Sequence, residues 1–87
     1  MDHIRMDVYA IDGNVAVVKL PARRFPGILV QGDTMKMLAN IVREALDAED
    51  RAASQQVLNE AYDLIGGFLR VYETALQNEG ERLPYVS

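Results

Sequence analysis

The sequence has no cysteine and only one histidine, His3. Without a thiol, the chain has no disulfide scaffold, no thiolate zinc site and no thiol nucleophile. A single imidazole excludes a two-histidine metal site, and its place near the start of the chain favours an exposed side chain over a catalytic triad. We therefore expect no catalytic residue, no metal site and no cofactor, and we predict that the protein is not an enzyme.

Long apolar runs are also missing. No run approaches the roughly 20 residues of a transmembrane helix. Residues 1–5 lack the basic and then apolar pattern of a signal peptide. These features predict a cytoplasmic protein that does not contact a membrane.

Basic residues are scarce in the second half of the chain. Residues 1–43 hold six Lys or Arg and four Asp or Glu, whereas residues 44–87 hold three and nine, so the acidic excess lies in the second half. An acidic half repels nucleic acid phosphates and suits a basic protein surface. Acidic side chains that only keep a small domain soluble are the alternative explanation.

The sequence does contain enough apolar residues for one small core. Of its 87 residues, 49% are hydrophobic, which is typical of globular proteins and too high for disorder. The length predicts a single domain over residues 1–87. A chain this short buries about 60–65% of the surface that its unfolded form exposes. The core is therefore thin, and either is packed efficiently or is completed by a partner or a second copy.

Residues 4–11 and 15–20 predict a β-hairpin. Apolar and polar residues alternate along 4–11, as in a half-buried strand. The apolar residues that share one face are Ile4, Met6, Val8 and Ala10. The intervening Asp12-Gly13-Asn14 is a strong hairpin signal, because Asp and Gly both tolerate a positive φ.

Pro21 ends the second strand, because it has no amide hydrogen to donate to a sheet. Residues 21–27 predict a loop that is rich in Pro, Arg and Gly. Residues 28–31 predict a short third strand that is buried on both faces. Gly32 ends this strand.

Two helices follow in the predicted order. Apolar residues three and four apart predict an amphipathic helix over 34–48, capped by Asp33 or Thr34. A broader apolar stripe predicts a second helix over 54–79, with Ser54 as its cap and Gly80 as its left-handed stop. The breadth of this stripe indicates contact with another helix or another chain.

These elements together predict an α+β fold in the order β-β-β-α-α. A three-stranded, mainly antiparallel sheet packs against an antiparallel helix pair, and the apolar tail 81–87 packs back on the domain, with a short edge strand as one alternative for the tail. Uncovered sheet edges and the broad helical stripe make a homodimer a further expectation.

Arg23, Arg24 and Phe25 form the best candidate binding site. Two guanidinium groups beside an aromatic ring can hold a phosphate and stack on a base, or they can pair with carboxylates of a partner. The acidic charge of the chain favours a protein partner over nucleic acid. Asp33 is either a helix cap or, together with Arg23 and Arg24, part of a pocket for a small ligand.

Residues 25–34, with the sequence FPGILVQGDT, and the helix that follows resemble HicB-type antitoxins. Residues 79–84 are also similar to the stretch before the last strand of that family. The resemblance implies a degenerate RNase H-like fold without nuclease activity, which neutralises an RNA-cleaving toxin by direct binding. The chain departs from that family at Lys36-Met37, and in its long second helix.

Over nearly its full length, the chain more closely resembles a family of short, uncharacterised bacterial proteins. The similar segments are residues 16–21, residues 23–33, Tyr72-Glu73 and Leu83-Pro84-Tyr85. That family has no assigned activity, so this resemblance implies no function.

We predict from these features a non-catalytic protein-binding module, antitoxin-like or immunity-like, with an unidentified protein partner. One alternative is a small-ligand-binding or enzymatic domain, which requires a cleft beside residues 21–27 with Arg23, Arg24 and Asp33 around it. The other alternative is a weak RNA-binding protein that uses Arg23 and Arg24.

Overall fold

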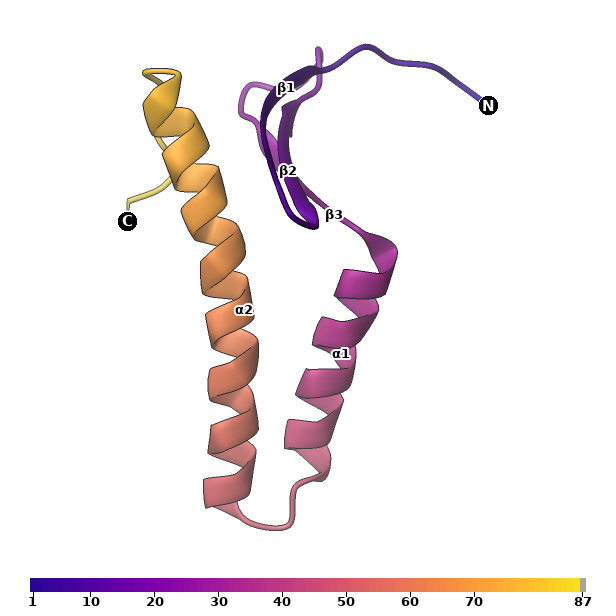
Figure 1. The fold of residues 1–87 in the computed structure, drawn as a ribbon, viewed down its shortest axis with the longest axis vertical. Helices are drawn as coiled ribbons and strands as arrows, with labels where there is room; N and C mark the ends of the chain where they lie inside the picture. The colour runs from indigo at the N-terminus through magenta and orange to yellow at the C-terminus, as the bar shows by residue number, and fades with distance from the viewer. Residues whose placement is uncertain (87) are drawn as a thin grey trace. The chain divides into compact units, whose positions relative to one another are not determined.

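The computed structural model describes residues 1–86 as three strands followed by two helices (Figure 1). The elements divide into two compact units that share the last helix. We call Met1–Val30 with Phe68–Ser87 the sheet unit, and Gln31–Gly67 the helical unit. The order of the elements and the antiparallel sheet confirm the predicted α+β fold. The prediction of a single domain stays a prediction.

The predicted β-hairpin is confirmed. Strand β1 (Asp7–Asp12) pairs with strand β2 (Val15–Lys19) in antiparallel register. Between them Gly13 has a φ of 60°, whereas Asn14 has no positive φ. A positive φ at only the first central residue is the mark of a type II′ turn, whose twist matches that of the flanking strands.

A β-bulge at Tyr9 divides the apolar face that the alternation in residues 4–11 predicts. Val8 pairs with Val18 and Ala10 pairs with Val17, so one extra residue lies between two consecutive pairs. An extra residue reverses which side of the sheet the following side chains face. Tyr9 and Ala10 therefore both pack against the core, whereas Val8 is exposed. The prediction of one shared face for Val8 and Ala10 is wrong.

Strand β3 (Gly27–Val30) pairs with β2 and completes an antiparallel sheet of order β1-β2-β3. Ile28 and Val30 are half-buried, but Leu29 between them is 57% exposed. The prediction that this strand is buried on both faces is therefore wrong. The reason is that the core of the sheet unit lies on one side of the sheet only.

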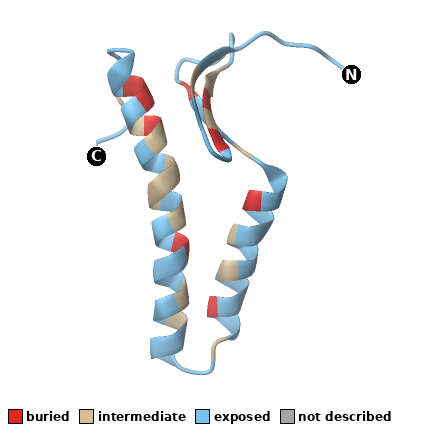
Figure 2. Cartoon of the chain, in the orientation of Figure 1, coloured by how far each residue is buried: buried red, intermediate tan, exposed pale blue. Residues whose placement is uncertain are grey.

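The core of the sheet unit combines the sheet with the C-terminal part of helix α2 (Arg51–Asn78). Its buried members are Val17, Tyr72, Ala75 and Leu76. Residues that pack around them come from strands, helix and tail: Tyr9, Ala10, Ile28, Val71 and Leu83. Figure 2 shows the buried residues of α2 near its C-terminal end on the side toward the strands.

Tyr72 joins three parts of this unit. Its hydroxyl group donates a hydrogen bond of 2.8 Å to the carbonyl oxygen of the buried Pro26, just before β3. Its ring stacks on the ring of Tyr85 in the tail, with 6.4 Å between the ring centres. The tail therefore packs back on the unit as predicted. No strand forms in its described residues, 81–86.

We expect Tyr72→Phe to lower the free energy of unfolding by about 1–3 kcal/mol, because it leaves the buried Pro26 carbonyl without a donor. Chemical denaturation followed by circular dichroism measures this change. Tyr62→Phe is the matched control, since Tyr62 is 75% exposed and should lose little stability. Equal effects of the two substitutions would contradict the role of the hydrogen bond.

The two helices begin earlier than their predicted caps. Helix α1 (Gly32–Asp47) has Gln31 at its N-cap position without a side-chain hydrogen bond. Asp33 lies within the first turn and accepts a 2.8 Å hydrogen bond from the Thr34 amide. Asp33 and Thr34 are thus not caps, because the chain enters the helix directly from β3. A carboxylate in the first turn still interacts favourably with the helix dipole.

Helix α2 is capped by Asp50, and the prediction of Ser54 is wrong. The Asp50 carboxylate accepts a 2.8 Å hydrogen bond from the Ala53 amide, and the Asp50 carbonyl oxygen accepts a 3.1 Å hydrogen bond from the Ser54 amide. Asp is as good a cap as Ser. The intervening residues 51–53 are strong helix formers, so the helix can start at the earlier of the two signals.

The predicted stop at Gly80 is confirmed. Gly80 has a φ of 69°. The Glu81 amide donates to the Leu76 carbonyl at 2.9 Å, and the Gly80 amide donates to the Gln77 carbonyl at 3.0 Å. This pair of hydrogen bonds is the Schellman motif, which needs a residue in the left-handed region.

We expect Gly80→Ala to destabilise the fold by about 1–2 kcal/mol, because L-residues disfavour the left-handed conformation. Gly32→Ala is the matched control, because Gly32 is the first residue of α1. Neither glycine has an atom within 4 Å of an added Cβ, and Gly32 has no positive φ. Gly32→Ala should therefore stabilise by about 0.4–1 kcal/mol. Thermal unfolding compares the two, and a shift of the same sign would refute this explanation.

Candidate functional site

The predicted Arg23-Arg24-Phe25 segment lies in the loop between β2 and β3. A hydrogen bond of 3.1 Å from the Arg23 amide to the Leu20 carbonyl closes a turn at the start of this loop. The Arg24 guanidinium lies over the Phe25 ring, 5.2 Å from the ring centre. This cation–π contact holds one of the two charges on the loop itself.

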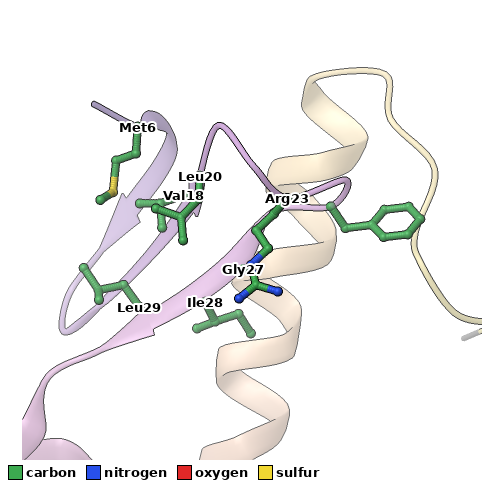
Figure 3. Close-up of a pocket in the computed structure, with 8 residues that line it drawn as sticks. Met6, Val18, Leu20, Arg23, Gly27, Ile28 and Leu29 are labelled. Atoms are coloured by element: carbon green, nitrogen blue, oxygen red, sulfur yellow. The ribbon is translucent and has the colours of Figure 1, made fainter. Parts of the chain in front are cut away.

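A pocket of about 380 Å³ opens beside this loop in the sheet unit. Its lining is almost entirely apolar: Met6, Val18, Leu20, Arg23, Phe25, Gly27, Ile28 and Leu29. Figure 3 shows the Arg23 side chain extending from the loop toward Gly27, with Val18 and Leu29 on the strands and Met6 just before β1. Arg23 is the one charged residue in this lining.

The pocket is part of a larger apolar surface on the side of the sheet opposite the core. We define this outer sheet face by six residues: Met6, Val8, Ile11, Val18, Leu20 and Leu29. The register places Val8 beside Val18, and it pairs Ala16 with both Ile11 and Leu29. Ile11 is 74% exposed, and Val8 is 56% exposed.

The structure brings together only part of the predicted site. Arg23 and Phe25 line the pocket, but Arg24 and Asp33 do not. Asp33 belongs to the helical unit, where its carboxylate binds the Thr34 amide. A pocket therefore lies beside residues 21–27, but the predicted arrangement of Arg23, Arg24 and Asp33 does not surround it.

Sequence reasoning missed the apolar residues that make up most of the outer sheet face. A signal for them was present in β2, where four apolar residues follow one another from Val15 to Val18. Side chains alternate between the two faces of a strand, so such a run makes both faces apolar. Val15 and Val17 are buried, and Val18 lies on the other face.

The described residues, 1–86, contain no group of three His, Cys, Asp or Glu side chains that could hold a metal ion. The same part of the chain has no helix that is both long and apolar enough to cross a membrane. The pKa is raised at three tyrosines of the sheet unit, Tyr9, Tyr72 and Tyr85. Tyr9 and Tyr85 donate hydrogen bonds to glutamates, and these contacts tie the tail to the rest of the unit.

The Tyr9 hydroxyl donates a 2.7 Å hydrogen bond to the Glu81 carboxylate, and this bond is the main reason that the pKa of Tyr9 rises to about 12. Burial is the main reason that the pKa of Tyr85 also rises to about 12, and its 2.9 Å hydrogen bond to Glu73 adds to the effect. Burial raises the pKa of Tyr72 as well.

We expect the free energy of unfolding to fall as the pH rises from about 10 to 12, because unfolded tyrosine ionises near 10 and folded Tyr9 and Tyr85 ionise near 12. In this window the unfolded state binds fewer protons than the folded state, so higher pH favours unfolding. Below the unfolded pKa, this contribution is fully present.

Denaturant titrations at a series of pH values test this dependence. The double variant Tyr9→Phe with Tyr85→Phe removes both phenols, so its stability should fall less steeply above pH 10. An unchanged slope in that variant would show that the two phenols are not responsible.

Comparison with known families places the chain in one of them. Residues 1–85 match a family of unknown function (DUF6959), and the chain belongs to this family. This result confirms the resemblance to an uncharacterised family. No characterised protein and no solved structure in the comparisons matches the chain. The resemblance to HicB-type antitoxins stays a prediction.

Proposed function

We propose that this member of the DUF6959 family is a non-catalytic module that binds a partner protein through its outer sheet face. The observation that carries the proposal is the continuous apolar surface on the side of the sheet opposite the core. Soluble monomers rarely expose large contiguous apolar patches, and such patches commonly mark interaction sites. The face includes Ile11, Val8 and Leu29, each more than half exposed.

The outer sheet face has the composition of an interface centre. Large apolar side chains surround the pocket, and one Arg stands at its rim. Aromatic residues and Arg are enriched at interfaces, and an apolar anchor that fills a pocket contributes most of the binding energy. The face therefore suits a partner that inserts an apolar side chain into the pocket.

Arg23 adds a requirement for charge on that partner. Its guanidinium borders the pocket, whereas the neighbouring Arg24 already lies over Phe25. A carboxylate beside the apolar anchor of the partner would pair with Arg23 in a partly desolvated site. We therefore propose a partner with an apolar side chain next to an Asp or Glu.

The resemblance to HicB-type antitoxins supports a more specific role within this proposal. In that role the chain is antitoxin-like or immunity-like, and it masks a harmful partner by binding to it. The apolar outer sheet face supports such a role, because masking a partner requires a binding surface and no catalytic residues.

A small ligand is the second candidate occupant, and the pocket is the observation that favours it. Its volume of about 380 Å³ lies within the range of roughly 300–1,000 Å³ that is usual for ligand sites. The lining suits an apolar molecule with one anionic group for Arg23. Saturable binding of such a molecule to the isolated chain, with no protein captured, would favour this candidate.

The partner hypothesis is tested with Leu29→Asp, which places a charge on the outer sheet face in the lining of the pocket. We expect the wild-type chain to capture one protein reproducibly from its native host. Leu29→Asp should weaken binding of that purified protein by at least about 30-fold, the loss of a typical central anchor of about 2 kcal/mol. Isothermal titration calorimetry measures both affinities.

Met37→Asp is the matched control, because Met37 is also a large apolar residue with about half of its surface exposed but lies in the helical unit. It should bind the partner with wild-type affinity. Undiminished binding by Leu29→Asp, or repeated capture of no protein, would refute the proposal.

A further inference from the structure

The helical unit is a hairpin of two antiparallel helices, joined by the short connection 48–50 (Figure 1). Each helix has one row of buried and half-buried residues on the side toward the other helix (Figure 2). On α1 this row includes Thr34, Ile41 and Ala45; on α2 it includes Val57, Ala61 and Leu64. These rows form the inner seam of the hairpin.

A second apolar row on each helix begins one residue after the first. On α1 it consists of Met35, Val42 and Leu46; on α2 it consists of Leu58, Tyr62 and Ile65. All six side chains are exposed, and the exposed fraction reaches 73% at Leu46 and 75% at Tyr62. The hairpin therefore has a second apolar surface beside its inner seam.

Both outer rows lie on one side of the hairpin. A step of one residue turns the side chain by about 100° around the helix axis. Because α1 and α2 run in opposite directions, the same step turns the two rows toward the same side. The six residues thus form one continuous surface, which we call the helical apolar face.

We infer that the helical apolar face pairs with the same face of a second copy of the chain, which gives a four-helix arrangement. A flat apolar face made of two antiparallel helices is best covered by another pair of helices, as in four-helix bundles. A two-fold axis along the helices would place α1 of each copy beside α2 of the other. This inference does not depend on the proposed function, because it involves the helical unit alone.

The size of the face is sufficient for a dimer. The six side chains expose on the order of 600 Å² per copy, since a fully exposed large side chain presents roughly 200 Å². Two copies would then bury about 1,200 Å², the lower limit of a standard specific interface. Neighbouring polar side chains at the rim would add to this area.

Four of the six side chains match in height along the helices under this symmetry. With a rise of 1.5 Å per residue from the connection 48–50, Met35 and Tyr62 both lie about 17–18 Å along their helices. Met35 of one copy would therefore face Tyr62 of the other. Val42 and Leu58 lie about 8–11 Å along, by the same count, and would form the second layer.

The dimer is tested by sedimentation velocity over a range of concentrations. We expect a species of twice the 9.7 kDa of one chain. Tyr62→Glu should weaken dimerisation at least 10-fold, and Leu46→Glu should do the same. Both sites are exposed in the single chain, so circular dichroism should show that the variants remain folded.

Leu29→Glu on the outer sheet face is the matched control and should leave the dimer intact. Three outcomes would overturn the inference: a wild-type monomer at all concentrations, a dimer that both helical variants retain, or a dimer that Leu29→Glu alone disrupts. Partner binding that Leu29→Asp leaves undiminished would refute the proposed function alone, whereas a dimer that both helical variants retain would refute the dimer alone.

Cross-linking tests the arrangement of the helices, and the absence of native cysteine makes it specific. Chains with Met35→Cys and chains with Tyr62→Cys are mixed and oxidised. The mixed disulfide should exceed both disulfides between identical chains. A predominance of either identical pair would overturn the pairing of α1 with α2 of the other copy.

Discussion

The sheet unit depends on the hydrogen bond from Tyr72 to the Pro26 carbonyl. Pro26 is buried at the point where the loop enters β3, so its carbonyl needs a donor from within the protein. Tyr72 supplies the donor, and the same ring packs in the core and stacks on Tyr85. The path of the loop, the position of the third strand and the docking of the tail therefore all rely on one side chain. Residues 26, 72 and 85 are far apart in the sequence, so this contact forms only when the whole unit is assembled.

A second constraint is that so short a chain has too few helices and strands to cover all of its apolar surface. The sheet has apolar residues on both faces, but the core of the sheet unit lies on one. The helical hairpin likewise has an inner seam and an outer apolar row on each helix. Apolar surface of this extent is costly to leave in water. The two proposals give each surface its own occupant: a partner protein for the outer sheet face, and a second copy for the helical apolar face.

The features that sequence analysis predicted are those with a local cause. The β-hairpin follows from alternation and Asp-Gly, and the end of α2 follows from Gly80, whose left-handed conformation suits glycine. The bulge at Tyr9 could not be predicted, because one extra residue leaves no mark in the pattern of β1. The helix starts were missed because Asp50 and Ser54 are equally good local caps. The site was predicted only in part. Arg23 and Phe25 could be identified from their side-chain chemistry. Leu29 and Val18 could not, because only the strand register shows that they lie on the outer sheet face.

The bulge at Tyr9 has a consequence for how this strand tolerates change. Val8 and Ala10 are two positions apart, and yet they lie on opposite sides of the sheet, with Ala10 against the core and Val8 exposed on the outer sheet face. Deletion of a single residue from β1 would reverse the face on which every side chain on one side of the deletion lies. Replacement of one apolar residue by another would alter only the packing at that position. A change in the length of β1 would therefore disturb the sheet more than a change of one apolar side chain for another.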